Sequence, residues 1–335
     1  IMKTYRNLFV GLFVLIAACM SCNQGNKPEI GISMGPIHER WIKDKDFLTD
    51  HLESRGAKVY ARMAEGSQET QNEQIKLLIN KKPDVLIIVP VNSKKCGAVA
   101  NLARNKGIKV IAYDRIIKNC NLDFYLSFDN VKVGELQAEY ITRIKPTGEY
   151  AVLGGSPTDN NSSLIKLGQM NILQPLITKG DIDIVLDRFV MDWSPERSFE
   201  IVDQYLNEHE PMDAIIAASD AVADGAAKAL KKHKLGGKVL LTGQDATVKA
   251  CKRIVEGTQT MTVYKSIESL AYSTAKIAID LAKGVDIPNT YTTTNNGKVM
   301  VPSILLSSVV PVNKENIRMT VIADGYLDEN AIFEK

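Results

Sequence analysis

The sequence predicts a two-lobed α/β protein in which each lobe is a mostly parallel sheet with helices on both faces. Short apolar runs alternate with helix-period segments from Glu29 onward, and this alternation occurs twice with similar length and pattern. The run at 85–89 (VLIIV) is apolar at every position, as expected for a strand covered on both faces. A chain of 335 residues is also long enough for about two domains.

The first series contains short apolar runs separated by amphipathic stretches, which is typical of βαβ units with parallel strands. Its expected strands are 30–34, 58–62, 85–89, 109–113 and 124–128. Its expected helices are 41–55, 69–80 and 94–106.

The second series repeats the pattern. Its expected strands are 150–153, 182–190, 214–217, 239–242 and 261–263, and its expected helices are 161–178, 195–208, 221–232 and 247–256. Ser194 and Pro195 favour an N-cap followed by the first helical residue. A final long helix at 266–284 ends at a glycine, as helix C-termini prefer.

No low-complexity linker separates the two series, which suits lobes joined by short crossing segments. The crossings are expected near 128–130, 264–265 and 308–311. The expected first lobe is therefore 29–128 plus 266–308, and the expected second lobe is 129–265 plus 309–335.

The N-terminal segment is expected to be a lipoprotein signal peptide over residues 1–21, followed by a polar tether at 22–28. A short basic region precedes an apolar stretch at 8–18, which is too short for a mature membrane-spanning helix. Cys19 follows a triplet that resembles a lipoprotein cleavage site, whereas Cys22 leads directly into the tether. Either cysteine is a candidate for lipidation, and an unlipidated signal peptide is the alternative.

Composition argues against nucleic acid and metal as partners. The chain has 41 Lys and Arg against 39 Asp and Glu, and removal of Lys3 and Arg6 with the signal peptide leaves 39 of each. Nucleic-acid binding needs clustered positive charge, and no cluster is present in the sequence. The four histidines are scattered without metal-ligand spacing. The cysteines beyond the tether are expected to be small packing residues, namely Cys96, Cys120 and Cys251.

Charged residues follow an expected buried strand in each series. Asp114 and Arg115 come after 109–113, and Asp245 comes after 239–242. Ligands of open α/β sheets bind outside the carboxyl ends of the strands. A carboxylate accepts hydrogen bonds from hydroxyls and an arginine donates to them, so the pattern favours a polyhydroxylated ligand. A surface ion pair or a helix cap is the alternative at Asp114 and Arg115.

The two tryptophans of the chain, Trp41 and Trp193, both stand at polar junctions between expected strands and helices. Such positions suit flat platforms for the C–H faces of a sugar ring, although either side chain alone is equally compatible with a core. Asn161 follows the loop 154–159 and offers both donors and an acceptor, or a simple turn. The Gly154-Gly155 pair does not match a dinucleotide or P-loop spacing, so no cofactor is expected.

These positions resemble the type I sugar-binding proteins of bacterial ABC transporters, in particular the members that bind D-xylose. The similarity extends from about residue 29 to nearly the C-terminus. The matching stretches are ERW (39–41), AYDR (112–115), SFDN (127–130), VGELQA (133–138), GGSP (154–157), DNN (159–161), GQDA (243–246) and GTQTMTVYK (257–265).

The resemblance implies two Rossmann-like lobes, joined by three crossing segments, that close on one pyranose. The implied sugar contacts are Arg40, Trp41, Asp114, Arg115, Asn161, Trp193, Asp245 and Lys265, with the two tryptophans sandwiching the ring. Ser219 stands where the family has Asn before Asp-Ala, so one hydroxyl contact would be lost or bridged by water. The segment 35–38 also departs from the acidic loop of the family.

The expected function is therefore that of a lipid-anchored, monomeric periplasmic protein that binds a pentose, D-xylose, and delivers it to an ABC permease. A sugar-sensing receptor subunit that signals to a histidine kinase or chemoreceptor is the alternative. A glycosidase using Asp114 and Asp245 is disfavoured, because Arg115 and Lys265 would keep both carboxyls ionised and leave no proton donor. A signal sequence stands where a repressor of the same fold would carry its DNA-binding headpiece.

Overall fold

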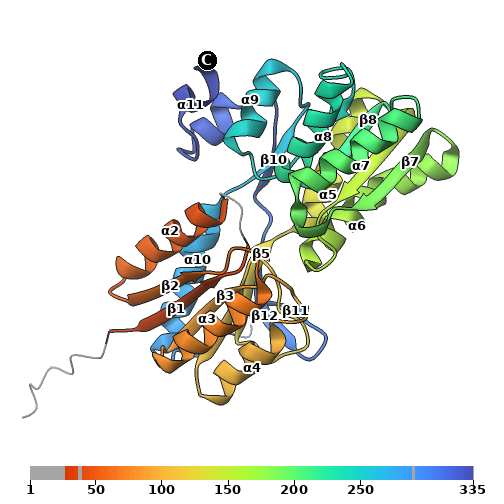
Figure 1. Cartoon of the computed structure of the whole chain (residues 1–335). Helices are drawn as coiled ribbons and strands as arrows, with labels where there is room; N and C mark the ends of the chain where they lie inside the picture. Colours follow the sequence, from red (N-terminus) through yellow and green to blue (C-terminus); the bar gives the residue numbers. More distant parts are fainter. Residues whose placement is uncertain (1–26, 37–39, 289–290, 335) are drawn as a thin grey trace, which may run out of the picture.

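The computed structural model describes residues 27–36, 40–288 and 291–334, which form two α/β lobes (Figure 1). This architecture confirms the fold class predicted from the sequence. The expected signal peptide and both candidate lipidation sites, Cys19 and Cys22, lie outside the described residues. Within the described part of the chain, no helix has the length and apolar character needed to cross a membrane.

The sheet of the first lobe has the strand order β11-β12-β5-β4-β3-β1-β2. Neighbouring strands are parallel except for β11 and β12, which are antiparallel. The strands are β1 (Glu29–Met34), β2 (Lys58–Met63), β3 (Val85–Val89), β4 (Lys109–Tyr113), β5 (Phe124–Phe128), β11 (Thr292–Asn295) and β12 (Met300–Leu306).

Helices cover both faces of this sheet (Figure 1). On one face, α2 (Arg40–Glu53) packs against α10 (Ile267–Ala282), and their apolar side chains join Ile30 and Ile32 in one core. On the other face, α3 (Gln68–Asn80) and α4 (Gly97–Asn105) form a second core with the alternate residues of β3 and β4. The uniformly apolar β3 is consistent with burial on both faces.

The sheet of the second lobe has the parallel order β7-β6-β8-β9. Its strands are β6 (Gly148–Gly154), β7 (Ile182–Phe189), β8 (Ala214–Ala217) and β9 (Leu240–Leu241). Its helices are α5 (Asn130–Ile144), α6 (Asn160–Lys179), η1 (Met191–Trp193), α7 (Pro195–Glu208), α8 (Asp220–Lys232) and α9 (Val248–Glu256). Apolar residues of α5 and α6 share a core on one face, whereas those of α7 and α8 pack on the other.

Glycines allow α5 and α6 to touch backbone to backbone. A Cβ at Gly134 would lie 1.9 Å from the carbonyl oxygen of Ile165, and one at Gly168 would lie 1.9 Å from that of Val131. Any larger residue at either position would force the two helices apart.

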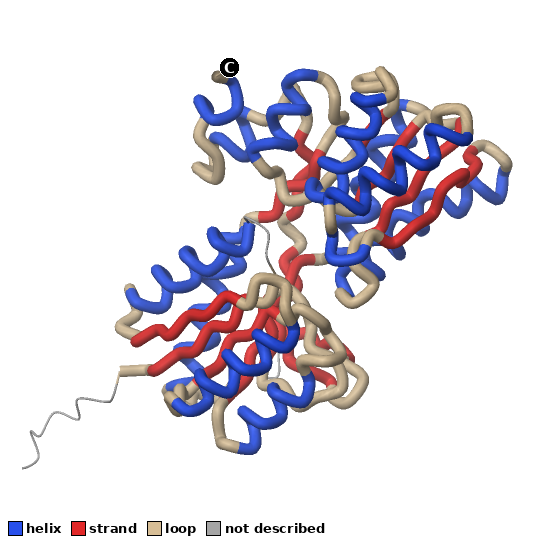
Figure 2. The backbone as a smooth tube through the Cα atoms, viewed as in Figure 1, coloured by secondary structure: helices blue, strands red, loops and turns tan. Residues whose placement is uncertain are grey.

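The chain passes between the lobes after β5, after β10 (Thr262–Lys265) and between β12 and β13 (Val309–Val312). Strands β10 and β13 pair antiparallel beside the junction (Figure 2). Asp129 and Ser266 cap the helices that begin just after the first two passages. The C-terminal elements η2 (Arg318–Ile322) and α11 (Glu329–Phe333) close the second lobe, where α11 packs against α9.

The structure contains elements that the sequence analysis did not assign. Helix α5 begins at Asn130, the last residue of the SFDN stretch. Strands β11 and β12 form a hairpin at the edge of the first sheet. The threonine- and asparagine-rich β11 has no apolar face, because it is an exposed edge strand. Strand β12 pairs with β5, which lies far earlier in the chain, so no local pattern reveals this pairing.

Candidate functional site

A cavity of about 200 Å³ lies between the lobes and is lined by side chains from both. The structure brings together around it every candidate residue from the sequence analysis, namely Arg40, Trp41, Asp114, Arg115, Asn161, Trp193, Ser219, Asp245 and Lys265. Other lining residues were not proposed from the sequence, among them Asn130, Asp159, Ile165, Pro195, Asp220 and Gln244.

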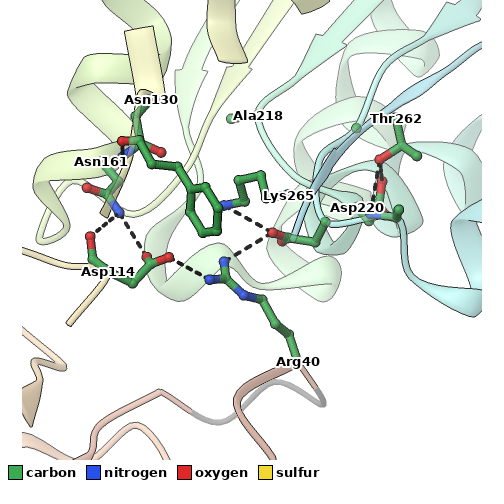
Figure 3. Close-up of polar contacts among 12 residues, drawn as sticks. Arg40, Asp114, Asn130, Asn161, Ala218, Asp220, Thr262 and Lys265 are labelled. Carbon is green, nitrogen blue, oxygen red and sulfur yellow. Dashed lines mark hydrogen bonds and ion pairs between the residues drawn. The ribbon is translucent and has the colours of Figure 1, made fainter. Parts of the chain in front are cut away.

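Arg40, at the start of α2, contacts carboxylates of both lobes (Figure 3). Its Nη2 donates to Asp114 Oδ2 at 2.5 Å, and its Nη1 donates to Asp245 Oδ1 at 3.1 Å. Its Nε donates to Asp44 Oδ2 at 3.1 Å. Burial by itself would lower the pKa of Arg40, but the charges of Asp114, Asp44 and Asp245 outweigh it and raise the pKa well above its usual value. Arg40 is therefore a permanent cation that bridges the cleft.

Asp44, one turn further along α2, holds Arg40 through its Nε and is itself held by Tyr113. The hydroxyl of Tyr113 donates to Asp44 Oδ1 at 2.5 Å, and both residues are fully buried. Burial raises the pKa of Asp44 to about 6, although the charge of Arg40 lowers it in part. The bond from Nε to Asp44 leaves the outer nitrogens of the guanidinium facing Asp114 and Asp245.

Asp114 lies in a left-handed turn directly after β4, with φ of 59°. Hydroxyls of Ser127 and Tyr125 donate to its carbonyl oxygen at 2.6 and 3.2 Å. From the other lobe, Asn161 Nδ2 donates to the same carbonyl at 3.1 Å and to Asp114 Oδ1 at 3.0 Å. These bonds stabilise a backbone conformation that is unfavourable for a residue with a side chain.

The charge state of Asp114 follows from its neighbours. Burial would raise the pKa of this carboxyl, but Arg40, Lys265 and Arg115 outweigh burial and hold the pKa below its usual value. Asp114 is thus ionised at neutral pH and acts only as a hydrogen-bond acceptor.

Asp245 occupies the equivalent place in the second lobe, with φ of 101° after β9. Lys265 Nζ, at the end of β10, lies 3.3 Å from Asp245 Oδ1 and 5.2 Å from the ring centre of Phe128. Burial would raise the pKa of Asp245, but Lys265 and Arg40 outweigh it, so the pKa is lowered. Two ionised acceptors, one from each lobe, therefore share the cation Arg40, and Asp245 also pairs with Lys265.

The ion-pair partner of Arg115 is Asp159, not the adjacent Asp114, although the charge of Arg115 still helps to lower the pKa of Asp114. Arg115 Nε lies 2.8 Å from Asp159 Oδ2, and both side chains are buried. Asp159 also caps α6 by accepting from the backbone N–H of Asn161 at 2.9 Å. This ion pair joins the two lobes, and Arg40 rather than Arg115 is the arginine that contacts Asp114. The sequence signal for Asp159 was its place in the DNN stretch.

The tryptophans approach the cavity from opposite lobes. The guanidinium carbons of Arg40 and Arg115 lie 4.4 and 5.1 Å from the ring centre of Trp41, within cation–π range. Trp193 itself has a positive φ of 58°. A Cβ at Gly155 would lie only 2.1 Å from the Cη2 atom of Trp193. Gly155 therefore makes the room that Trp193 occupies.

Smaller polar groups complete the lining. Ser219 caps α8 by accepting from the backbone N–H of Val222 at 3.3 Å, and its hydroxyl proton is still available for donation. The buried Oδ1 of Asn161 has no hydrogen-bond partner among the described residues, so it can accept from a hydroxyl. Asn130 Nδ2 donates to Ser127 Oγ at 3.3 Å and to Phe128 O at 3.2 Å.

The arrangement suits Asp114 and Asp245 to binding rather than to acid–base chemistry. The carboxyls expected for a glycosidase, Asp114 and Asp245, both have lowered pKa values, so neither can hold the proton that a general acid needs. Among the residues that the structure describes, no group of three or more His, Cys, Asp and Glu side chains could hold a metal ion.

Comparison with known proteins identifies the family. Residues 30–286 match the model of the periplasmic binding protein domain. The chain belongs to the periplasmic binding protein family. It is 44% identical over 329 residues to the D-xylose-binding periplasmic protein of Escherichia coli (strain K12), covering 98% of this chain and 99% of the relative. It is 46% identical over 307 residues to the protein of the same name from Haemophilus influenzae, covering 91% and 92%.

Solved structures of solute-binding proteins share the two-lobed fold. An ABC transporter solute-binding protein from Clostridium phytofermentans with bound β-D-glucose superposes with a TM-score of 0.84 at 28% identity, covering 91% of this chain and 99% of that one. A carbohydrate transporter solute-binding protein from Chloroflexus aurantiacus, in complex with D-glucose, also gives 0.84, at 29% identity and with 92% and 99% coverage. The resemblance noted in the sequence is confirmed, and family membership confirms that the chain is a binding protein and not an enzyme.

Proposed function

We propose that this chain is the solute-binding component of an ABC sugar importer and that its ligand is a pyranose, D-xylose. The observation that carries the proposal is the pairing, in one cavity between the lobes, of ionised Asp114 and Asp245 with Arg40 and Lys265. Each hydroxyl of a sugar is both donor and acceptor, so a ring of alternating carboxylates and cations suits it. The two D-xylose-binding relatives support the choice of sugar.

The proposed mechanism is closure of the lobes around the sugar. Arg40, Trp41, Asp114 and Arg115 belong to the first lobe, and the other contacts belong to the second. A ligand that touches both sets is bound more tightly in the closed state, and its binding shifts the population toward closure. The membrane permease would then recognise the closed, loaded protein.

The proposed location is the periplasm, where the protein acts as a monomer attached to the membrane by a lipid on Cys19 or Cys22. The periplasmic relatives support the location, and the cysteines that follow the apolar N-terminal stretch support the anchor. Metabolic labelling with a palmitate analogue, followed by mass spectrometry of the N-terminal peptide, tests the anchor. Label on Cys19→Ser but not on Cys22→Ser would assign Cys22, and the reverse would assign Cys19. Equal labelling of the wild type and a Cys19→Ser, Cys22→Ser double variant would contradict an N-terminal lipid.

Calorimetric titration with D-xylose, L-arabinose, D-ribose, D-glucose and D-galactose tests the ligand. We expect D-xylose to bind most tightly and to raise the melting temperature by mass action. D-Glucose is the most informative competitor, because it differs from xylose by one hydroxymethyl group and is the ligand in two of the solved relatives. Tighter binding of glucose would reject xylose as the ligand, and no binding across the panel would reject the sugar class.

A further inference from the structure

We propose that Asp220 is a positioning residue, which holds Asp245 and Lys265 in their binding geometry through hydrogen bonds and does not itself bind the sugar. Asp220 opens α8 and is 2% exposed, next to Ser219 on the wall of the cavity. The inference rests on the proposed function, because it assigns the support of the same site.

The carboxylate of Asp220 is fully used by protein donors. Its Oδ2 accepts from the backbone N–H of Thr247 at 2.8 Å and from the Thr247 hydroxyl at 3.2 Å. Its Oδ1 accepts from Thr262 Oγ1 at 2.8 Å and from Gln259 Nε2 at 3.2 Å. A carboxylate has about four lone-pair sites, so little acceptor capacity remains for a ligand.

These donors belong to the segments that present the two charged contacts. Thr247 lies two residues after Asp245, and Thr262 lies at the start of β10, which ends at Lys265. The backbone N–H of Asp220 also donates to the carbonyl of Gln244 at 2.9 Å. One buried carboxylate therefore ties the segment 244–247 to β10 (Figure 3).

The segment needs such support because its backbone is strained. Asp245 and Ala246 have φ of 101° and 51°, which residues with side chains rarely adopt. The backbone N–H of Ala246 donates to Thr262 Oγ1 at 3.3 Å. Because the Thr262 hydroxyl gives its proton to Asp220, its lone pairs are turned toward Ala246. Asp220 thus stabilises the strained turn directly at Thr247 and indirectly through Thr262.

Gly243 leaves the space that the Asp220 carboxylate occupies. A Cβ at Gly243 would lie 2.0 Å from Asp220 Oδ1 and 2.6 Å from Gln259 Nε2, so only glycine fits there. Among the described residues no cation forms an ion pair with Asp220, although Arg253 approaches through its bond to Gln259 Oε1 at 3.0 Å. A buried carboxylate held mainly by neutral donors is costly for folding, and such local costs are concentrated at functional sites.

The test is a double-mutant cycle read by titration with D-xylose. Asp220→Asn replaces an acceptor by a donor against Thr247 or Thr262, and we expect affinity to fall by roughly 10- to 100-fold. In an Asp245→Asn background the same substitution should cost clearly less affinity than in the wild type, because the part of its effect that passes through Asp245 is already lost and only the part through Lys265 remains. Additive losses in the two backgrounds would overturn the proposal, and so would near-wild-type affinity of Asp220→Asn.

A matched pair at Thr262 keeps the proposal testable if Asp220→Asn does not fold. Thr262→Val removes the hydroxyl at nearly constant shape, whereas Thr262→Ser keeps it. We expect weaker binding for Val and near-wild-type binding for Ser, with circular dichroism used to verify folding of both. Equal D-xylose affinities of the Val and Ser variants would overturn the positioning role of Asp220 through Thr262. If the wild-type protein binds no sugar, the proposed function and this inference both fall; if it binds and the variants do not behave as stated, only the positioning role fails.

Discussion

The turns that carry Asp114 and Asp245 reach the same result by different means. Both follow a buried strand, both have positive φ, and both present an ionised carboxylate to the cavity. The turn at Asp114 is held by neutral donors on its carbonyl oxygen, from Tyr125 and Ser127 of the neighbouring strand. The turn at Asp245 is held through a second buried carboxylate, Asp220.

The two turns differ in which elements supply their hydrogen bonds. Strand β5 pairs with β4, and two of its hydroxyls donate to the carbonyl oxygen of Asp114 in the first turn. The second lobe has only the short β9 at this edge, and β10 continues toward the other lobe after a single bridge between Gln244 and Val263. Asp220 supplies the connection that a longer strand pairing would otherwise provide.

Removal of Arg40 should have the largest effect, since it joins both turns. Arg40→Ala leaves Asp44, Asp114 and Asp245 without their shared cation, and we expect the free energy of unfolding to fall by about 3–5 kcal/mol. Sugar binding should be lost as well. Urea unfolding and calorimetry measure the two effects. Arg62→Ala is the control, because Arg62 is exposed and the one hydrogen bond of its side chain among the described residues goes to the carbonyl of Ala61; a loss as small as that of the control would contradict the bridging role.

The pH dependence of stability should reveal the titration of Asp44, which holds Arg40 next to Asp114. The pKa of Asp44 is raised from 3.8 to about 6, so the folded protein binds this proton more tightly than the unfolded chain does. Its contribution to stability is complete below about pH 4 and is lost as the pH rises through about 6. Asp44→Asn should therefore reduce the fall in the free energy of unfolding between pH 4 and pH 7 by up to about 3 kcal/mol.

Urea unfolding at several pH values measures this dependence. The lowered pKa values of Asp114 and Asp245 act in the opposite direction, and their stabilisation is lost only as the pH falls below about 4. Asp220, whose pKa is also raised to about 6, retains its part of the slope in the variant. An unchanged slope for Asp44→Asn would show that Asp44 does not titrate in this range.

Direct comparison of the two carboxylates shows whether both lobes hold the sugar. Asp114→Asn and Asp245→Asn should each weaken D-xylose binding by about 1.5–3 kcal/mol, the usual contribution of a charged hydrogen bond. Asp46→Asn is the control, because this side chain on α2 is largely exposed. Wild-type affinity for one variant and a large loss for the other would confine the sugar to one lobe.

The smallest expected effect concerns Ser219. Ser219→Asn restores the residue that the family pattern has at this place, and asparagine caps a helix about as well as serine, so α8 should keep its N-terminus. The longer amide should change the affinity for one sugar of the panel by about 0.5–1.5 kcal/mol, the net contribution of one hydrogen bond. Titration of the whole panel measures it, and identical affinities for all sugars would show that Ser219 does not face the ligand.

Much of the fold could be predicted from local pattern. The expected strand 85–89 coincides with β3, and the expected helix 195–208 coincides with α7. Strand β11 was missed because its exposed edge position removes the apolar alternation by which strands are recognised, and β12 pairs with β5, which lies far earlier in the chain. The expected strand 239–242 is reduced to Leu240–Leu241, and the chain beyond it leads into the positive-φ turn at Asp245 and Ala246.

The two-lobed α/β class and the charged residues after β4 and β9 follow from local sequence pattern, since periodicity and strand ends are local properties. Which of these charges meet depends on the three-dimensional packing. It paired Arg115 with Asp159 rather than Asp114, and it made Asp220 the support of Asp245. Ion pairs and buried hydrogen bonds depend on distances of a few ångströms between segments far apart in the chain, and those distances exist only in the folded protein.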